Sequence, residues 1–123
     1  MAFNVLPRII CYPSAIVVNT QSENQEGEHW LAMYFDKNRF CEFFDSFGLG
    51  PDYYNLELYV KTFASDLHFN NSQLQSYDSD TCGYYCIHFK LLKSRGFSLL
   101  EIVSMFDKED LKKNDNIIRN VIL

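Results

Sequence analysis

The chain has 123 residues, the length of one ordinary domain, so we expect a single domain over residues 1–123. Hydrophobic residues make up 47% and charged residues 22%, a composition that can bury a core and excludes a disordered tail. A net charge of −5 without basic runs argues against nucleic acid as the main partner, because phosphate binding needs clustered cations. The sequence has no apolar stretch near the roughly 20 residues of a membrane span and no signal-peptide pattern, so we expect a soluble, intracellular protein without a membrane partner.

Strand patterns occupy the first part of the chain. β-Branched residues predict a short buried strand at 15–19, and the polar stretch 21–27 predicts a loop. Two further runs, at 29–35 and 40–45, flank turn-forming residues and predict an antiparallel hairpin. Apolar side chains alternate onto both faces of the second run, so we expect both faces of the sheet to be covered.

Helical patterns dominate the remainder. Apolar spacing predicts helices at residues 52–64, 81–95, 97–105 and 108–123. The second of these should end at Gly96, since glycine readily takes the left-handed conformation that closes a helix. We expect the last to break near Asn114. Residues 67–75 predict a short strand or an extended loop.

Three reactive side chains stand where the predicted structure changes type: His29 at the start of a strand, Asp45 at the end of the next strand, and Cys82 at the start of a helix. Because a hairpin brings its strand ends to one edge, Asp45 can hold one imidazole nitrogen of His29 while the other faces the thiol. An imidazolium and a helix N-terminus both lower the pKa of a thiol. The pattern therefore indicates nucleophilic catalysis by a thiolate, with the backbone N–H of Cys82 facing a developing oxyanion.

Two nearby residues fit the same chemistry. Gly83 lets a substrate backbone approach the nucleophile, and the side-chain amide of Gln75 can add an oxyanion donor. Spacing alone leaves other interpretations open, because many chains contain His, Asp and Cys.

A zinc site is one alternative, built from Cys82, Cys86 and His88 with either Cys41 or His29. Cys82 and His88 should point to different sides of one helix, so we expect no metal and no cofactor. For Cys86 we expect a place in the core; the alternatives are a share in a metal site or reaction with an oxidised Cys82.

An ordered set of strings resembles the adenovirus-protease-like cysteine peptidases, which belong with the SUMO and ubiquitin-like proteases. The strings are Gly27-Glu28-His29-Trp30, residues 42–49, Gln75 and Cys82-Gly83-Tyr84-Tyr85-Cys86. The resemblance is greatest to the versions from Maverick/Polinton elements and related DNA viruses. In those proteins Met-Phe-Asp and Asn-Asp segments also follow the last catalytic helix, as at 105–107 and 114–115 here.

This resemblance implies an α+β, papain-like cysteine protease fold, with a small, mostly antiparallel sheet packed against the helix that bears the nucleophile. It implies the following roles: general base for His29, orienting carboxylate for Asp45, oxyanion donor for Gln75, nucleophile for Cys82 and cleft wall for Trp30. Relatives usually carry a further segment before the first strand, so we expect this chain to lack an N-terminal segment.

The function that follows from the resemblance is a cysteine endopeptidase, whose polypeptide substrates are viral or transposon structural precursors. Two alternatives stay open. One is a non-catalytic pseudoprotease that binds a ubiquitin-like tail or a capsid partner. The other is an isopeptidase of the deSUMOylase or deubiquitinase kind, acting on a ubiquitin-like protein.

Overall fold

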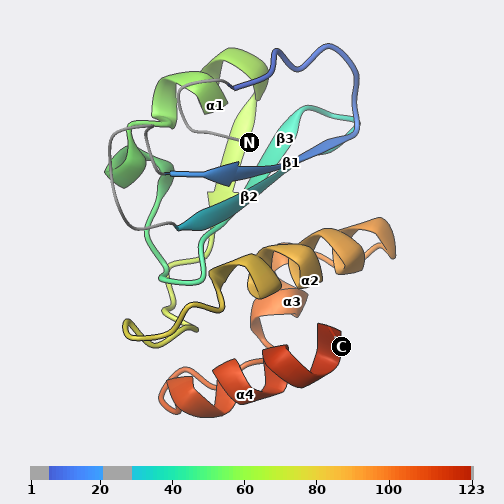
Figure 1. Ribbon diagram of the computed structural model, residues 1–123. Helices are drawn as coiled ribbons and strands as arrows, with labels where there is room; N and C mark the ends of the chain where they lie inside the picture. Colours follow the sequence, from blue (N-terminus) through green and yellow to red (C-terminus); the bar gives the residue numbers. More distant parts are fainter. Residues whose placement is uncertain (1–5, 21–28, 123) are drawn as a thin grey trace.

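The computed structural model describes residues 6–20 and 29–122, which form a four-stranded sheet with helices on both faces (Figure 1). The elements in chain order are β1 (Ser14–Asn19), β2 (Trp30–Phe35), β3 (Phe40–Phe44), the 3-10 helix η1 (Pro51–Tyr54), α1 (Glu57–Phe63), β4 (Asp66–Phe69), α2 (Cys82–Ser94), α3 (Leu99–Val103) and α4 (Leu111–Ile122). The expected α+β fold, with its small and mostly antiparallel sheet against the helix of Cys82, is confirmed.

The strand order is β1-β2-β3-β4. The first three strands are antiparallel, and β4 pairs with β3 in parallel after the chain returns through α1. Of the two alternatives for residues 67–75, the short strand is confirmed over the first part. The predicted strand at 15–19 exists but is mostly half-buried, because β1 is an edge strand. The loop predicted at 21–27 lies outside the described residues.

Each face of the sheet covers a separate apolar core, which confirms the expectation from β3. Cys41 and Phe43 point to the side of α1, whereas Phe44 points to the side of α2. Figure 1 shows α2 and α3 below the sheet and α4 farther out, beyond α2. Among the described residues, no helix combines the length and apolar character needed to cross a bilayer.

The predicted helix at 52–64 is wrong in one respect, because it is interrupted. Asn55 has a φ of 59°, in the left-handed region, and separates η1 from α1. Asparagine tolerates this conformation better than most residues. The interruption turns Tyr54 away from the course of a continuous helix.

The predicted helix at 81–95 is confirmed as α2, and Gly96 follows it with a φ of 92°. The helix predicted at 97–105 is shortened to α3, where Ser98 and Glu101 form a reciprocal capping box. The prediction of a break near Asn114 is wrong. Asn114 lies in the first turn of a continuous α4, and its side chain bonds to groups outside that helix.

Glu42 on β3 connects the sheet to two helices. Its carboxylate forms an ion pair with Lys93 near the end of α2 and accepts a hydrogen bond from the backbone N–H of Leu99 at 2.8 Å. The Lys93 and Glu42 side chains are only 11% and 20% exposed. Because water screens this pair weakly, its loss should matter more than that of a surface pair.

We expect Glu42→Ala to lower the free energy of unfolding by about 2–4 kcal/mol, because it leaves the Lys93 ammonium and the Leu99 N–H without an acceptor. Urea unfolding measures the change. Glu109→Ala, which removes an exposed carboxylate, is the control and should leave stability nearly unchanged. Equal losses in the two variants would contradict this role for Glu42.

Candidate active site

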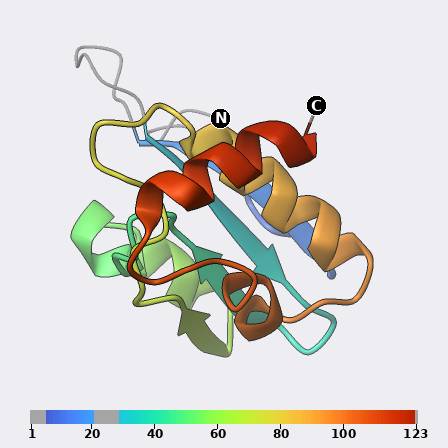
Figure 2. The same ribbon diagram turned by 90° about the horizontal axis from the view of Figure 1, so that it is seen from below.

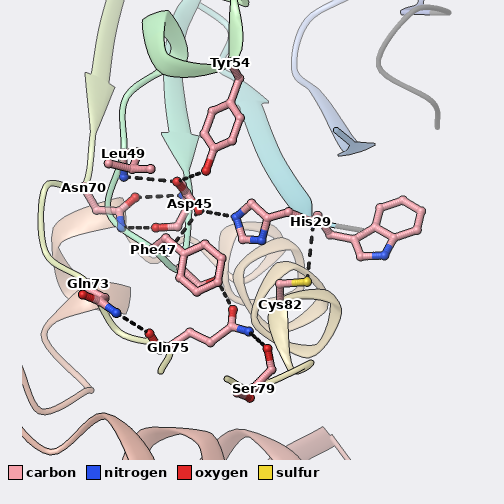
Figure 3. Close-up of polar contacts among 12 residues, drawn as sticks. His29, Asp45, Phe47, Leu49, Tyr54, Asn70, Gln73, Gln75, Ser79 and Cys82 are labelled. Carbon is pink, nitrogen blue, oxygen red and sulfur yellow. Dashed lines mark hydrogen bonds and ion pairs between the residues drawn. The ribbon is translucent and has the colours of Figure 1, made fainter. Parts of the chain in front are cut away.

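His29 and Asp45 meet at the edge of the sheet where β2 begins and β3 ends. The distance from Nε2 of His29 to Oδ1 of Asp45 is 2.5 Å (Figure 3). The Asp45 side chain is completely buried and that of His29 is 13% exposed. The hairpin therefore makes direct neighbours of two residues 16 positions apart, as expected from the sequence.

Cys82 is the first residue of α2, and its sulfur lies beside these two residues (Figure 3). The backbone N–H of Trp30 donates to Sγ of Cys82 at 3.4 Å. Nδ1 of His29 is buried, and the thiol of Cys82 is hydrogen-bonded to the His29 ring. Cys82 is 5% exposed, so the sulfur lies at the bottom of the site.

Both reactive groups have shifted pKa values. Burial lowers the pKa of His29, but hydrogen bonds with Asp45 and Cys82 outweigh it and raise that pKa to about 9. Burial raises the pKa of Cys82, but hydrogen bonds with His29 and with the Trp30 N–H outweigh it and bring that pKa below its ordinary value. The two shifts favour a thiolate beside an imidazolium.

Asp45 is held by more partners than the sequence indicated. The hydroxyl of Tyr54 donates to Oδ2 at 2.6 Å, and the backbone N–H groups of Phe47 and Leu49 donate to Oδ1 and Oδ2. The Asn70 side chain bonds both the N–H and the C=O of Asp45. Neither Tyr54 nor Asn70 was expected at this site from the sequence. The Asn70-Asn71 pair is a feature that could have indicated such a role, since asparagines in turns often bond to backbone.

Aromatic rings stack on the imidazole. The ring centre of Phe47 lies 4.3 Å from that of His29 with an interplanar angle of 19°, and Tyr54 stacks at 5.9 Å. The ring of Tyr77 continues the row beyond Phe47. Phe47 and Tyr54 therefore pack directly against the imidazole and limit the access of water to it.

Gln75 lies beneath this group and is completely buried. Oε1 accepts a hydrogen bond from Ser46 Oγ at 2.6 Å, and Nε2 donates to the Ser79 carbonyl at 2.8 Å (Figure 3). A primary amide carries two N–H donors, and the bond to Ser79 uses one of them. In the structure Gln75 holds the segment that leads into α2, and its role as an oxyanion donor stays a prediction.

Trp30 and Gly83 border a surface groove that begins beside Cys82. The groove has a volume of about 530 Å³ and is also lined by Tyr84, Ile87, Asp80 and Arg119. Gly83 faces the indole, since a Cβ built there would lie 3.6 Å from Cδ1 of Trp30. The lining of the groove is mainly apolar, and its charged residues are Asp80 and Arg119.

The residues considered for a zinc site do not come together as a cluster of ligands in the described part of the chain. Within residues 6–20 and 29–122, no group of three or more His, Cys, Asp or Glu side chains could hold a metal ion. Cys86 is fully buried in the core on the side of α2, as expected, and His88 packs against Phe106.

Comparison with known proteins bears on the fold. No protein-family model matches the sequence, and no curated protein does. Among solved structures, the chain is similar to the crystal structure of the ASFV pS273R protease, with a TM-score of 0.54 and 20% sequence identity. The chain shares the fold of a viral protease. The match covers 85% of this chain but 42% of the viral protein, so the chain spans less than half the length of the protein it matches.

The pKa shifts predict a particular pH profile for alkylation of Cys82 by iodoacetamide. The lowered pKa keeps thiolate populated as the pH falls, so the reaction rate should begin to drop at a lower pH than that of an ordinary exposed thiol. In His29→Ala, burial still raises the Cys82 pKa while the main opposing hydrogen bond is gone. The rate near pH 7 should then fall roughly tenfold or more and recover only at higher pH.

Cys11 is exposed, so these rates are measured in a Cys11→Ser background by mass spectrometry. Burial raises the pKa of Cys41 to about 12 and that of Cys86 well above its ordinary value, so neither should contribute. Identical pH profiles with and without His29 would show that the imidazole does not activate the thiol.

Proposed function

We propose that this chain is a cysteine endopeptidase that cleaves polypeptides through an acyl-enzyme thioester. The observation that carries the proposal is the contrast among its buried cysteines. Burial raises the pKa of Cys41 and of Cys86, whereas Cys82 alone among the three has a lowered pKa, next to an imidazole whose own pKa is raised. A buried thiol kept as a thiolate beside a proton donor is what nucleophilic catalysis needs.

The proposed reaction has two halves. The Cys82 thiolate attacks the scissile carbonyl carbon, forming a C–S bond and an oxyanion that the N-terminus of α2 and the second N–H of Gln75 stabilise. The C–N bond then breaks as the His29 imidazolium gives its proton to the leaving amine. In the second half, neutral His29 takes a proton from water, and the resulting hydroxide attacks the thioester and releases Cys82. Asp45 holds the ring throughout.

The proposed substrates are viral or transposon structural precursors cut after small residues, such as a Gly-Gly pair. One fact supports the choice of viral precursors, since a solved structure with a similar fold is a viral protease. The preference for small residues comes from the resemblance to the adenovirus-protease-like peptidases.

Two other functions use the same geometry. A pseudoprotease would bind a ubiquitin-like tail or a capsid partner in the groove without cleaving it. An isopeptidase would act on the C-terminus of a ubiquitin-like protein. Neither is favoured by a specific observation, and both are separated from the proposal by the experiment below.

A library of quenched peptides, measured in the Cys11→Ser background, tests the endopeptidase. We expect turnover that falls roughly a thousandfold or more in Cys82→Ala and in His29→Ala, since each removes a reacting group. Cys86→Ala changes the other cysteine of α2 and is the control that should keep turnover. Selective Cys82 alkylation without turnover of any peptide would favour the pseudoprotease, and cleavage confined to ubiquitin-like fusions would favour the isopeptidase.

Gly83→Ala tests whether the substrate lies in the groove between Gly83 and Trp30. An added Cβ meets only ordinary van der Waals contact with Trp30, so the variant should fold, and replacing a helical glycine should stabilise it by about 1 kcal/mol. Peptide turnover should nevertheless fall, because the methyl group narrows the groove, while the iodoacetamide rate stays unchanged. Unaltered turnover would mean that the substrate does not pass between Gly83 and Trp30.

A further inference from the structure

A second buried carboxylate, Asp115 of α4, contacts the segment that leads into the nucleophile helix. Asp115 is 3% exposed. Its hydrogen-bond donors are Ser76 Oγ at 2.6 Å, Ser76 N at 3.4 Å, Thr81 Oγ1 at 3.1 Å and the Tyr85 hydroxyl at 2.9 Å. Burial of a carboxylate is costly unless such bonds compensate it. All four donors lie between residues 76 and 85.

The neighbouring residue, Asn114, binds the start of the same segment. Its Nδ2 donates to the Leu74 carbonyl at 3.0 Å, and its Oδ1 accepts from the Asp107 N–H at 2.8 Å. Two adjacent residues of α4 therefore hold both ends of segment 74–81. Figure 2 shows this segment passing beside α4 before it enters α2.

The opposite side of the segment is bound to the residue that follows Asp45. The carbonyl of Ser46 accepts from the backbone N–H groups of Leu74 and Gln75, at 2.8 and 3.0 Å. Ser46 Oγ bonds the Gln75 amide, which in turn bonds the Ser79 carbonyl. The position of the Gln75 amide thus depends on where the segment 74–81 is held. On the side of α4, Asp115 holds it through the hydrogen bonds from Ser76 and Thr81.

We propose that Asp115 is a positioning residue for the reaction. It fixes residues 76–81 against α4 and so sets where the Gln75 amide lies relative to the sulfur of Cys82. Asp115 touches no reacting atom. This inference rests on the proposed function, and it separates two parts of the site: His29 and Trp30 generate the thiolate, whereas Asp115 acts on the groups that receive the oxyanion.

Two reactions distinguish these parts. Iodoacetamide alkylation needs only the thiolate, whereas hydrolysis of p-nitrophenyl acetate also needs a stabilised oxyanion. In the Cys11→Ser background, Asp115→Ala should lower kcat/KM for the ester by roughly a hundredfold and leave the alkylation rate within about twofold. Asp115→Asn, which keeps one acceptor oxygen, should recover part of the loss. Equal falls in both rates would reduce Asp115 to a structural role and overturn the proposal.

A second, milder variant keeps the test valid if Asp115→Ala fails to fold. Ser76→Ala removes one hydrogen bond from the segment side and should give a smaller ester defect. Combined with Asp115→Ala, it should add little, because both changes break the same contact. Full additivity of the two defects would overturn the proposal.

Hydrogen exchange gives a readout that does not need activity. Amides of residues 76–81 should exchange roughly tenfold faster in Asp115→Ala, with β2 and α1 unchanged. Unchanged exchange in 76–81 overturns the Asp115 proposal even if the protein is an active peptidase. Faster exchange in a protein that hydrolyses neither ester nor peptide supports the fixing of the segment by Asp115, and overturns the proposed function together with the catalytic purpose assigned to Asp115.

Discussion

The ion pair between Asp45 and His29 is the contact on which the rest of the site depends. A fully buried carboxylate persists only when its oxygens are bonded, and here the imidazole, the Tyr54 hydroxyl and two backbone N–H groups bond them. Because Asp45 holds Nε2 of His29, only Nδ1 is left for the sulfur. The raised pKa of the imidazole and the lowered pKa of the thiol both follow from this arrangement.

Hydrophobic packing, in turn, decides where the sulfur lies. The ring of Phe89 on α2 stacks on that of Phe44 on β3, with centres 5.0 Å apart and an interplanar angle of 11°. Cys86 and Tyr85 of the same helix are completely buried in the core between α2 and the sheet. This core therefore fixes the position and direction of α2 relative to the sheet. As a consequence, Cys82, the first residue of that helix, lies beside His29. The geometry of the candidate site thus depends on apolar side chains outside it.

Local patterns succeeded where a single segment decides its own conformation. The β2–β3 hairpin and α2 with its closing Gly96 follow from alternation, turn residues and capping, which act over a few positions. The pattern failed at Asn55 and at Asn114. In both cases an asparagine was ambiguous: one takes a left-handed conformation inside an expected helix, and the other bonds to distant groups from within an intact helix. Sequence spacing cannot separate these two outcomes, because they depend on what the side chain meets.

The sequence by itself determined the edge of the sheet at which His29 and Asp45 meet and the start of a helix at Cys82, and its resemblance to a known family implied the α+β class. The first two are set by short-range periodicity and by the geometry of a hairpin. Only the tertiary structure decided that Tyr54 completes the shell of Asp45, that Gln75 is buried in the segment before α2, and that Asp115 holds that segment from α4. These contacts join residues 9 to 39 positions apart, and their partners are selected by three-dimensional packing that no local pattern records.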